Sequence, residues 1–359
     1  DQPQGKSGLV QLLSEVLDRG AGEWNQQQLA FEIEKRGANK YISADYDSFT
    51  IGFHGLSDDV DFFINALKAL TVSSHLQEGD IEKTKQKIID GWKHIGDDTG
   101  TLAAIGFERL MTAKTPYSRG VMHSLSEFRT ISRQDLQDFI KKRFLPQSSS
   151  LVIVGRFDIE RVKKQLRDFY PLTPYKAEPS LSIDDPIIKI STQPDEILLI
   201  HRPDAVQAEV KIGFEAPSIK HSDRYALGIA NALFGEYFTS RLNRVIRDQL
   251  GLTYGIGSSF VYQKEAAYFQ IGSSTRAESA GDMLSKTLAL LKEFSTGRIE
   301  QNEISTAREY LLGSYPLRVA SLSSVASLWL AGKVLDLNPD FMNQYLAQIG
   351  SVSDEQVVQ

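Results

Sequence analysis

Arg247 and Tyr254 are the two residues whose types and spacing first point to chemistry in this chain. A guanidinium is a permanent cation with five N–H donors, and a tyrosine hydroxyl both donates and accepts hydrogen bonds. The surrounding residues predict that Arg247 lies in the last turn of a helix and that Tyr254 begins a strand. Ordinary structural roles also fit, since Arg favours a helix C-terminus and Tyr is common in strands.

The helix before Tyr254 is predicted from a single apolar face. Its members recur at helical spacing and are Leu242, Val245, Ile246 and Leu250. Gly251 is a typical residue to follow the end of a helix. The predicted strand carries an alternating face made of Tyr254, Ile256, Ser258, Phe260 and Tyr262.

This segment, S-R-L-N-R-V-I-R-D-Q-L-G-L-T-Y-G-I-G-S-S-F at 240–260, resembles the C-terminal half of the pitrilysin/insulinase family of zinc metallopeptidases, the inverted zincins. Family members carry an Arg and, seven residues later, a Tyr, around a Leu-Gly. The resemblance implies that Arg247 holds the substrate backbone and that Tyr254 stabilises the oxyanion of the tetrahedral intermediate. Donors aimed at the charge that develops on a carbonyl oxygen lower the barrier to hydrolysis.

Active inverted zincins carry H-x-x-E-H on the first helix, where two His bind zinc and the Glu is the base. The matching positions of this chain read Gln11, Leu12, Leu13, Ser14 and Glu15. Neutral Gln is a poor zinc ligand, and Ser14 cannot act as a carboxylate base. On the helix that would supply the third ligand, the Glu position falls at or beside Gly91, and the neighbouring Asp90 would need a shifted register. The resemblance therefore implies no zinc or other cofactor in this chain, and zinc in a partner subunit.

No other motif replaces this site. The six His residues show no i, i+3 or i, i+4 pair typical of a helical metal site. His94 with Asp97 and Asp98 is expected to be a solvated helix end. The pair Gly255-x-Gly257 lacks the rest of a dinucleotide loop. The acidic pairs Asp58-Asp59 and Asp184-Asp185 are expected in solvated loops.

Composition limits the class of protein. The 359 residues, with 41% hydrophobic and 24% charged side chains, predict two or more globular domains. A net charge of −6 argues against nucleic-acid binding, and no apolar run is long enough to span a membrane. The absence of Cys excludes disulfides and Cys-bound metals. Neither end looks native, and we expect residues to be missing from both.

The order of predicted elements indicates an internal duplication. In the first half we expect helices at about 8–17, 25–35, 60–70, 79–94 and 159–169, strands at 42–53 and 150–154, and a helix capped by Ser132. In the second half we expect strands at 196–201, 208–214, 254–262 and 266–273, and helices at about 223–233, 239–250, 280–293 and 304–315. Val352-Ser353-Asp354 parallels Ile131-Ser132-Arg133 about 220 residues earlier.

A proline-rich stretch, Pro171–Pro186, separates the halves. We predict a first peptidase-like domain at 1–172, a linker at 173–188 and a second domain at 189–359. Family resemblance extends to Arg36–Phe49, to Gly55–Phe63 and to the Pro203–Gln207 turn. It implies an α+β, mitochondrial-processing-peptidase-like metallohydrolase fold, with two homologous domains that each hold a mainly antiparallel sheet flanked by helices.

The resemblance predicts a non-catalytic subunit of a heterodimeric zinc peptidase. Its partner would be a homologous catalytic subunit with H-x-x-E-H, and its substrate a peptide or unfolded polypeptide. The alternative is a scaffolding protein of the same fold with no role in proteolysis, and a third possibility is a stand-alone peptide-binding protein. Related small subunits occur in the periplasm or in mitochondria, and we expect the periplasm here.

Overall fold

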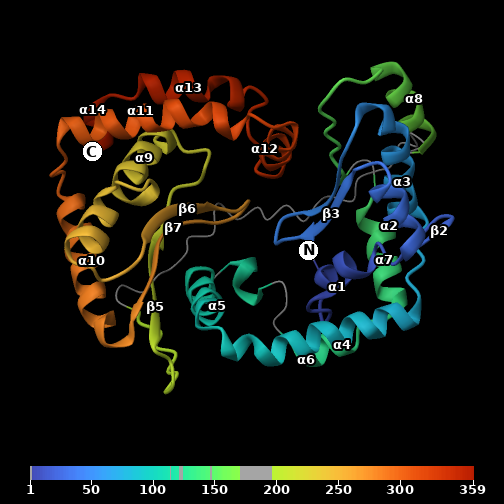
Figure 1. Ribbon diagram of the computed structural model, residues 1–359, viewed down its shortest axis with the longest axis horizontal. Coiled ribbons are helices and arrows are strands. Elements are labelled where there is room, and N and C mark those ends of the chain that lie inside the picture. The colour runs from blue at the N-terminus through green and yellow to red at the C-terminus, as the bar shows by residue number, and fades with distance from the viewer. Residues whose placement is uncertain (1, 114, 121–123, 146–147, 170–195) are drawn as a thin grey trace. The chain divides into compact units, whose positions relative to one another are not determined.

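The computed structural model describes residues 2–113, 115–120, 124–145, 148–169 and 196–359 (Figure 1). The chain has an α+β fold and divides into two compact units. The first unit comprises residues 1–93, 119–184 and 325–334, and the second comprises residues 94–118, 185–324 and 335–359. The predicted linker at 173–188 lies mostly in a stretch, 170–195, outside the described residues. The limits predicted for the two domains stay predictions.

The first unit is built mainly from helices and a β-hairpin. Its helices are α1 (Leu9–Val16), α2 (Gln26–Glu34), α3 (Val60–Val72), α4 (Glu78–His94), α6 (Leu125–Arg129), α7 (Arg133–Arg143) and α8 (Ile159–Phe169). Its strands form two antiparallel pairs, β1 (Gly20–Ala21) with β2 (Trp24–Asn25) and β3 (Asn39–Ala44) with β4 (Phe49–His54). The short helix α6 and the two-residue strands β1 and β2 add to what the sequence predicted.

Helix α1 lies at the centre of this unit's hydrophobic core. Its Leu9, Leu12 and Leu13 are completely buried, because they recur on one helical face. They belong to one cluster with residues of α2, α3, α4, α6 and α7, among them Phe128 and Leu136. Burial on this scale makes α1 a principal source of the unit's stability.

Side-chain caps fix where two of these helices begin. Asn25 caps α2, accepting a hydrogen bond from the backbone N–H of Gln28 while the Gln28 side chain accepts one from Asn25. Ser132 caps α7 through the same reciprocal arrangement with Asp135. The cap predicted at Ser132 is therefore confirmed.

The prediction of a single strand over residues 42–53 is wrong. The chain reverses at Asp45, whose carboxylate accepts hydrogen bonds from the backbone N–H groups of Asp47 and Ser48 at 2.8 and 2.6 Å. Such a turn, closed by an Asp side chain, competes with extended backbone. The result is the β3–β4 hairpin, in which Ile42 faces Ile51.

The second unit contains a three-stranded antiparallel sheet and most of the remaining helices (Figure 1). The sheet order is β5 (Gln207–Glu215), β7 (Ala267–Arg276), β6 (Ile256–Tyr262). The helices are α5 (Thr99–Met111), α9 (Arg224–Asn231), α10 (Ala280–Ser295), α11 (Gln301–Arg318), α13 (Phe341–Ser351) and α14 (Asp354–Val358). Helix α12 (Leu322–Val334) spans a boundary between the units. Two π-helical segments follow α9, at Ala232–Glu236 and at Asn243–Gln249.

Short 3-10 turns complete the described elements, at Ser57–Asp59, Ile95–Asp97, Pro116–Arg119 and Ala277–Ser279. In the second unit, one hydrophobic cluster joins α9, α11 and α13, and another joins the sheet to α10. Phe269 of β7 stacks on Phe214 of β5 at 4.9 Å between ring centroids. Helix α10 covers this side of the sheet, where its Met283 and Leu290 belong to the same cluster as Phe269.

Two further predicted strands are wrong. Neither 150–154 nor 196–201 pairs with another strand among the described residues. Leu151 is 48% exposed and Leu199 is 84% exposed, so these apolar residues are not buried as sheet residues would be. An apolar run becomes a strand only where a neighbour supplies backbone partners. The strand predicted at 208–214 is confirmed as β5.

Candidate functional site

The segment that carries Arg247 is a π-helix rather than an α-helix. Its backbone N–H groups reach one residue further back than in an α-helix, as where Leu250 donates to the carbonyl of Val245 at 3.0 Å. Leu242 and Ile246 are buried as predicted, but the widened turn leaves Leu250 43% exposed. The chain leaves the helix at Gly251, whose φ of 62° confirms the predicted glycine stop.

The Arg247 guanidinium is held by its neighbours along the chain. It donates to both carboxylate oxygens of Asp248, at 2.7 and 3.2 Å, and to the carbonyl of Phe238 at 3.1 Å. The ring of Phe238 lies 3.7 Å from the guanidinium carbon, a cation–π geometry. These contacts leave the Arg247 side chain only 14% exposed.

The hydrogen bond between Arg247 and Asp248 shifts the pKa of both side chains. The hydrogen bond from Arg247 lowers the pKa of the Asp248 carboxyl, and the same bond raises the pKa of the Arg247 guanidinium. Asp248 therefore stays an anion at neutral pH and competes with any substrate carbonyl for the guanidinium. A substrate that binds Arg247 must exchange with one of these local contacts.

Tyr254 has the opposite environment, because its side chain is 98% exposed. It lies outside the sheet, since β6 begins at Ile256, so the prediction that Tyr254 starts the strand is wrong. The backbone beside it is nevertheless fixed by Thr253. That hydroxyl donates to the carbonyl of Ser274 at 2.7 Å and accepts from the backbone N–H of Gly255 at 3.1 Å. The phenol is thus presented to solvent from an anchored loop.

Buried polar side chains anchor the segment further. Asn243 is 7% exposed, accepts a hydrogen bond from the backbone N–H of Ile256 at 3.3 Å and donates to the Ser240 hydroxyl at 3.2 Å. It therefore ties the π-helix to the start of β6. Arg241 is 8% exposed and forms an ion pair with Glu303 of α11. Directional bonds of this kind fix the position of a loop more closely than apolar packing does.

Sequence reasoning missed the residues that position this pair. Phe238, Asn243 and Thr253 carry no motif, although all three lie close in sequence to Arg247 or Tyr254, and their contacts appear only in the folded chain. Asp248 could have been found, because an acid next to a proposed substrate-binding Arg is visible in the sequence.

In the first unit, the structure places the zinc-motif positions on α1 as predicted, with their polar groups engaged locally. The Ser14 hydroxyl donates to the carbonyl of Gln11 at 2.8 Å. The carboxylate of Glu15 pairs with Lys87 of α4 at 2.9 Å. Gly91 also lies on α4, and a Cβ added there would meet no atom within 4 Å.

These residues do not fit the zinc that the family resemblance implies. A catalytic zinc site needs three protein ligands of His or carboxylate type. Glu15 is the one such donor at the motif positions, and an ammonium already pairs with it. Asp90 instead binds Lys93 at 2.7 Å and Gln86 at 2.9 Å. No zinc-dependent step can be assigned to these residues.

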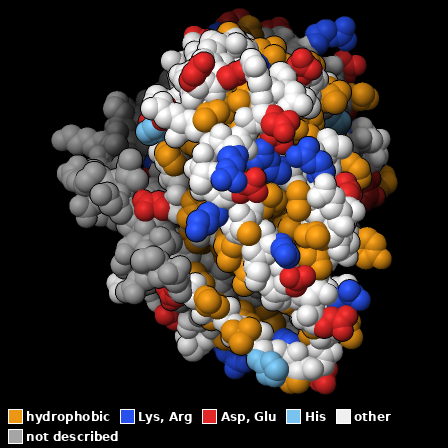
Figure 2. Space-filling model, turned by 90° about the vertical axis from the view of Figure 1, so that its left-hand side faces the viewer, with side chains coloured by type: hydrophobic (Ala, Val, Ile, Leu, Met, Phe, Trp, Pro, Cys, Tyr) orange, Lys and Arg blue, Asp and Glu red, His pale blue; other side chains and the backbone are white. Residues whose placement is uncertain are grey.

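The part of the chain that the structure describes holds no group of three or more His, Cys, Asp or Glu side chains that could bind a metal ion. The predicted cluster at His94 is a pair with Asp97 at 3.2 Å, with both side chains more than 70% exposed. None of the described helices is both long and apolar enough to cross a membrane. On the face shown in Figure 2, Lys and Arg side chains are mixed with Asp and Glu side chains.

The chain has an α+β fold, and the first helix, which aligns with the zinc motif of the resembled family, lacks both His ligands. A family model described as the Peptidase M16 inactive domain matches residues 130–311, about half of the chain. The chain belongs to the peptidase M16 family, also called the pitrilysin family.

Two relatives show similarity over most of the chain. A Helicobacter pylori protein named non-peptidase homolog YmxG is 25% identical over 347 residues, covering 94% of this chain and 78% of that protein. A Rickettsia bellii protein named uncharacterized zinc protease is 24% identical over 312 residues, covering 85% of this chain and 72% of that protein. The family therefore includes relatives named as peptidases and one named as a non-peptidase.

Solved structures share the fold. A peptidase M16 inactive domain from Pseudomonas fluorescens superposes with a TM-score of 0.80 at 20% identity, covering 99% of this chain and 85% of that one. A protease from Helicobacter pylori also gives a TM-score of 0.80, at 17% identity, covering 100% of this chain and 87% of that one. These likenesses confirm the α+β fold expected from the sequence.

Proposed function

We propose that this chain is the non-catalytic subunit of a heterodimeric zinc metalloendopeptidase. A homologous partner supplies H-x-x-E-H and zinc, and this chain supplies Arg247 and Tyr254 to the peptide bound there. Tyr254 stabilises the oxyanion of the tetrahedral intermediate, and Arg247 binds the substrate backbone. The observation that carries the proposal is Tyr254, a 98% exposed side chain on a loop whose backbone is fixed by hydrogen bonds.

A comparison of helix α1 with the loop of Tyr254 supports the assignment of zinc to the partner and of substrate contacts to this chain. Gln11, Ser14 and Glu15 provide no zinc ligand set, and their polar groups are engaged within the unit. Tyr254 has a hydroxyl that remains available in the isolated chain. An exposed aromatic side chain held at the tip of an ordered loop is typical of a residue that meets its partner on binding.

We also propose that the two halves arose by tandem duplication. The capping box of Ser132 with Asp135 has a counterpart in Ser353 with Gln356, and each Ser begins a helix. Long helices occupy matching places as well, α4 at Glu78–His94 and α11 at Gln301–Arg318. Under this proposal a partner with the same plan has a surface of matching architecture.

The test is to measure zinc content and peptide cleavage for this chain alone, for its H-x-x-E-H partner alone, and for the complex. We expect zinc and cleavage only where the partner is present, and faster cleavage in the complex. Zinc-dependent cleavage by this chain alone would refute the proposal.

Within the complex, Tyr254→Phe and Arg247→Ala should each lower kcat by roughly 100-fold, because the first removes a donor to the oxyanion and the second removes the group that positions the substrate backbone. Tyr310→Phe and Arg276→Ala are the matched controls in the second unit, at side chains that are themselves exposed. Both controls should leave kcat unchanged.

The competing function is a scaffold of the same fold. The contacts of Arg247 with Asp248 and Phe238 favour it, since they give the guanidinium a structural role without any substrate. A complex that assembles and cleaves at the same rate with Arg247→Ala and with Tyr254→Phe would establish the scaffold in place of our proposal.

A further inference from the structure

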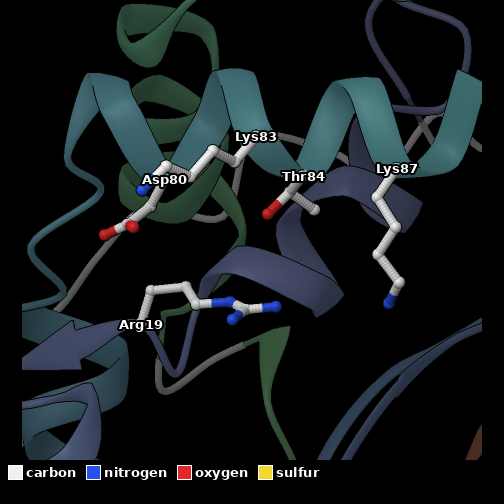
Figure 3. Close-up of a pocket in the computed structure, with 5 residues that line it drawn as sticks. All are labelled: Arg19, Asp80, Lys83, Thr84 and Lys87. Carbon is white, nitrogen blue, oxygen red and sulfur yellow. The ribbon is translucent and has the colours of Figure 1, made fainter.

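A small cavity of the first unit lies beside the degenerate motif. Its volume is about 230 Å³, and it is lined by Arg19, which follows α1, and by four residues of α4 (Figure 3). The α4 residues are Asp80, Lys83, Thr84 and Lys87. They share one helix face because they recur at three- and four-residue spacing. The lining therefore combines three cations with a single carboxylate.

Thr84 shows that the cavity is built for a polar ligand. The residue is 4% exposed, and its hydroxyl makes no hydrogen bond with any residue that the structure describes. Figure 3 shows the hydroxyl oxygen pointing from α4 toward the side of the cavity where the Arg19 guanidinium lies. The hydroxyl oxygen is not among the fully buried atoms without a partner, so it is open to the cavity, and a ligand there can form a hydrogen bond with it.

Arg19 supplies a fixed guanidinium on the opposite wall. Its Nε atom donates to the carbonyl of Glu15 at 3.2 Å, which fixes the side chain across the end of α1. The two terminal nitrogens form no hydrogen bond within the described part of the chain. They lie beneath Thr84 in Figure 3. A guanidinium anchored through Nε retains the pair of parallel N–H groups that match a carboxylate.

The two lysines add charge without closing the cavity. Lys83 forms no ion pair within the described ranges, and Figure 3 shows its side chain extending toward Asp80. Lys87 pairs with Glu15 at 2.9 Å, and its side chain is 70% exposed. A pair this exposed is weak and readily exchanges one anion for another.

We propose that this cavity binds a carboxylate of a peptide, either the free C-terminus or the side chain of Asp or Glu. The two terminal nitrogens of Arg19 and the hydroxyl of Thr84 bind the two carboxylate oxygens. The positive charges of Lys83 and Lys87 attract the carboxylate to the cavity. Asp80 within the lining favours a singly charged carboxylate over a phosphate, whose second charge it would repel. The site lies wholly in the first unit and needs neither a partner nor the Arg247–Tyr254 pair.

The test is a titration of the ¹⁵N-labelled chain, followed by amide NMR shifts. The probes are acetyl-Gly-Gly-Gly, its C-terminal amide, acetyl-Gly-Glu-Gly-amide and inorganic phosphate. We expect saturable shifts around Arg19 and residues 83–87 with one or both carboxylate peptides, and none with acetyl-Gly-Gly-Gly-amide. The two carboxylate peptides together decide whether a C-terminus or an acidic side chain is the natural group. Affinity should fall as salt is raised, because the attraction is between charges.

Variants separate the cavity from general charge attraction. Lys83→Gln and Arg19→Gln should each weaken carboxylate binding by about fivefold or more, as expected for loss of a charge-assisted contact. Thr84→Val should weaken binding while leaving the fold intact, since the hydroxyl has no bond to lose. Lys93→Gln is the matched control, a lysine of α4 outside the cavity, and should change the dissociation constant less than twofold.

Three results would overturn the proposal. The first is equal binding of acetyl-Gly-Gly-Gly-amide and the two carboxylate peptides, and the second is tighter binding of phosphate than of either carboxylate. The third is the absence of saturable binding up to ~10 mM, which corresponds to a negligible interaction free energy. Because the titration uses the chain alone, its outcome is independent of whether a complex cleaves peptides.

Discussion

The motif helix α1 and the segment from Ser240 to Gly255 both have a buried apolar face, but only the second adds a network of buried polar side chains. Leu9, Leu12 and Leu13 fix α1 through complete burial in a hydrophobic core. The Ser240–Gly255 segment also buries Leu242 and Ile246 completely, and it adds buried polar bonds of Arg241 and Asn243. Apolar attraction is non-directional, whereas a hydrogen bond weakens as its distance and angle leave a narrow range.

The difference shows what each region retains. Helix α1 supports the core through its buried face, and its residues at the positions of the resembled zinc motif provide no set of zinc ligands. The second segment keeps a defined orientation for its loop and presents one large side chain, Tyr254, to solvent.

The largest effect is expected from Leu13→Ala in α1. Leu13 is completely buried, and its truncation leaves a cavity that should lower the free energy of unfolding by about 3 to 4 kcal/mol. Urea denaturation followed by circular dichroism measures the loss. Ser14→Ala is the neighbouring control and should change stability by less than ~0.5 kcal/mol, because only a local hydrogen bond is removed. A loss below ~1 kcal/mol for Leu13→Ala would show that apolar packing does not hold α1.

Glu303→Gln should have the next largest effect, about 2 to 3 kcal/mol, because it leaves the buried Arg241 without its anion. Burial acts to raise the pKa of Glu303, but hydrogen bonds from Arg241, from the backbone of Glu300 and from Arg244 outweigh it, so the pKa lies below its ordinary value of 4.5. A lowered pKa contributes stability that is present above pH 4.5 and is lost as the pH falls through the folded-state value.

The pH dependence of the free energy of unfolding tests whether the Arg241–Glu303 pair stabilises the fold. The wild-type chain should lose stability on acidification below pH 4.5, and Glu303→Gln should lose less over the same range. Parallel stability curves for the two proteins would mean that the Arg241–Glu303 pair does not anchor the segment.

Asn243→Ala should cost about 1.5 kcal/mol, because the backbone N–H of Ile256 is left without its acceptor. The loss should be accompanied by faster hydrogen exchange at Ile256 and Gly255. Asn302→Ala, at the exposed start of α11, is a control that should leave exchange there unchanged. Unaltered exchange in Asn243→Ala would show that the loop of Tyr254 is held by other contacts.

The smallest effects on stability are expected at Tyr254 and Lys87. Tyr254→Phe removes an exposed hydroxyl, and Lys87→Gln breaks an exposed ion pair, so each should change the free energy of unfolding by less than ~0.5 kcal/mol. A thermal melt of each variant measures this. A larger loss for Tyr254→Phe would place its hydroxyl in a structural bond and weaken its proposed role at a partner's site.

Much of the architecture could be predicted from local patterns. Apolar periodicity predicts α1, α3, α4 and α8, and Ser132 marks the start of α7, because helices are specified by residues close in sequence. The hairpin at 39–54 was missed because its turn depends on one carboxylate, that of Asp45. The apolar runs at 150–154 and 196–201 were misread, since strand formation depends on distant partners that periodicity does not reveal.

The candidate site was only partly predictable. The positions of Arg247 and Gly251 relative to the helix end follow from the sequence, and Gly251 has the predicted backbone conformation. The environments of the two side chains do not follow, because the ring of Phe238 reaches Arg247 and the Thr253 hydroxyl reaches the carbonyl of Ser274 only in the folded chain. The cavity at Arg19 and Thr84 was also invisible, since its residues come from two helical regions and match no motif.

The π-helix at Asn243–Gln249 has a consequence for comparing this chain with its relatives. Such a segment is equivalent to an α-helix with one residue inserted, which turns every later side chain about the axis by the angle of a single residue. An alignment in which a relative has an ordinary α-helix here needs a one-residue gap before Gly251. Deleting one residue from this stretch would test whether it is equivalent to an α-helix with an insertion. The segment should then form an ordinary α-helix, with the side chains after the deletion turned about the helix axis.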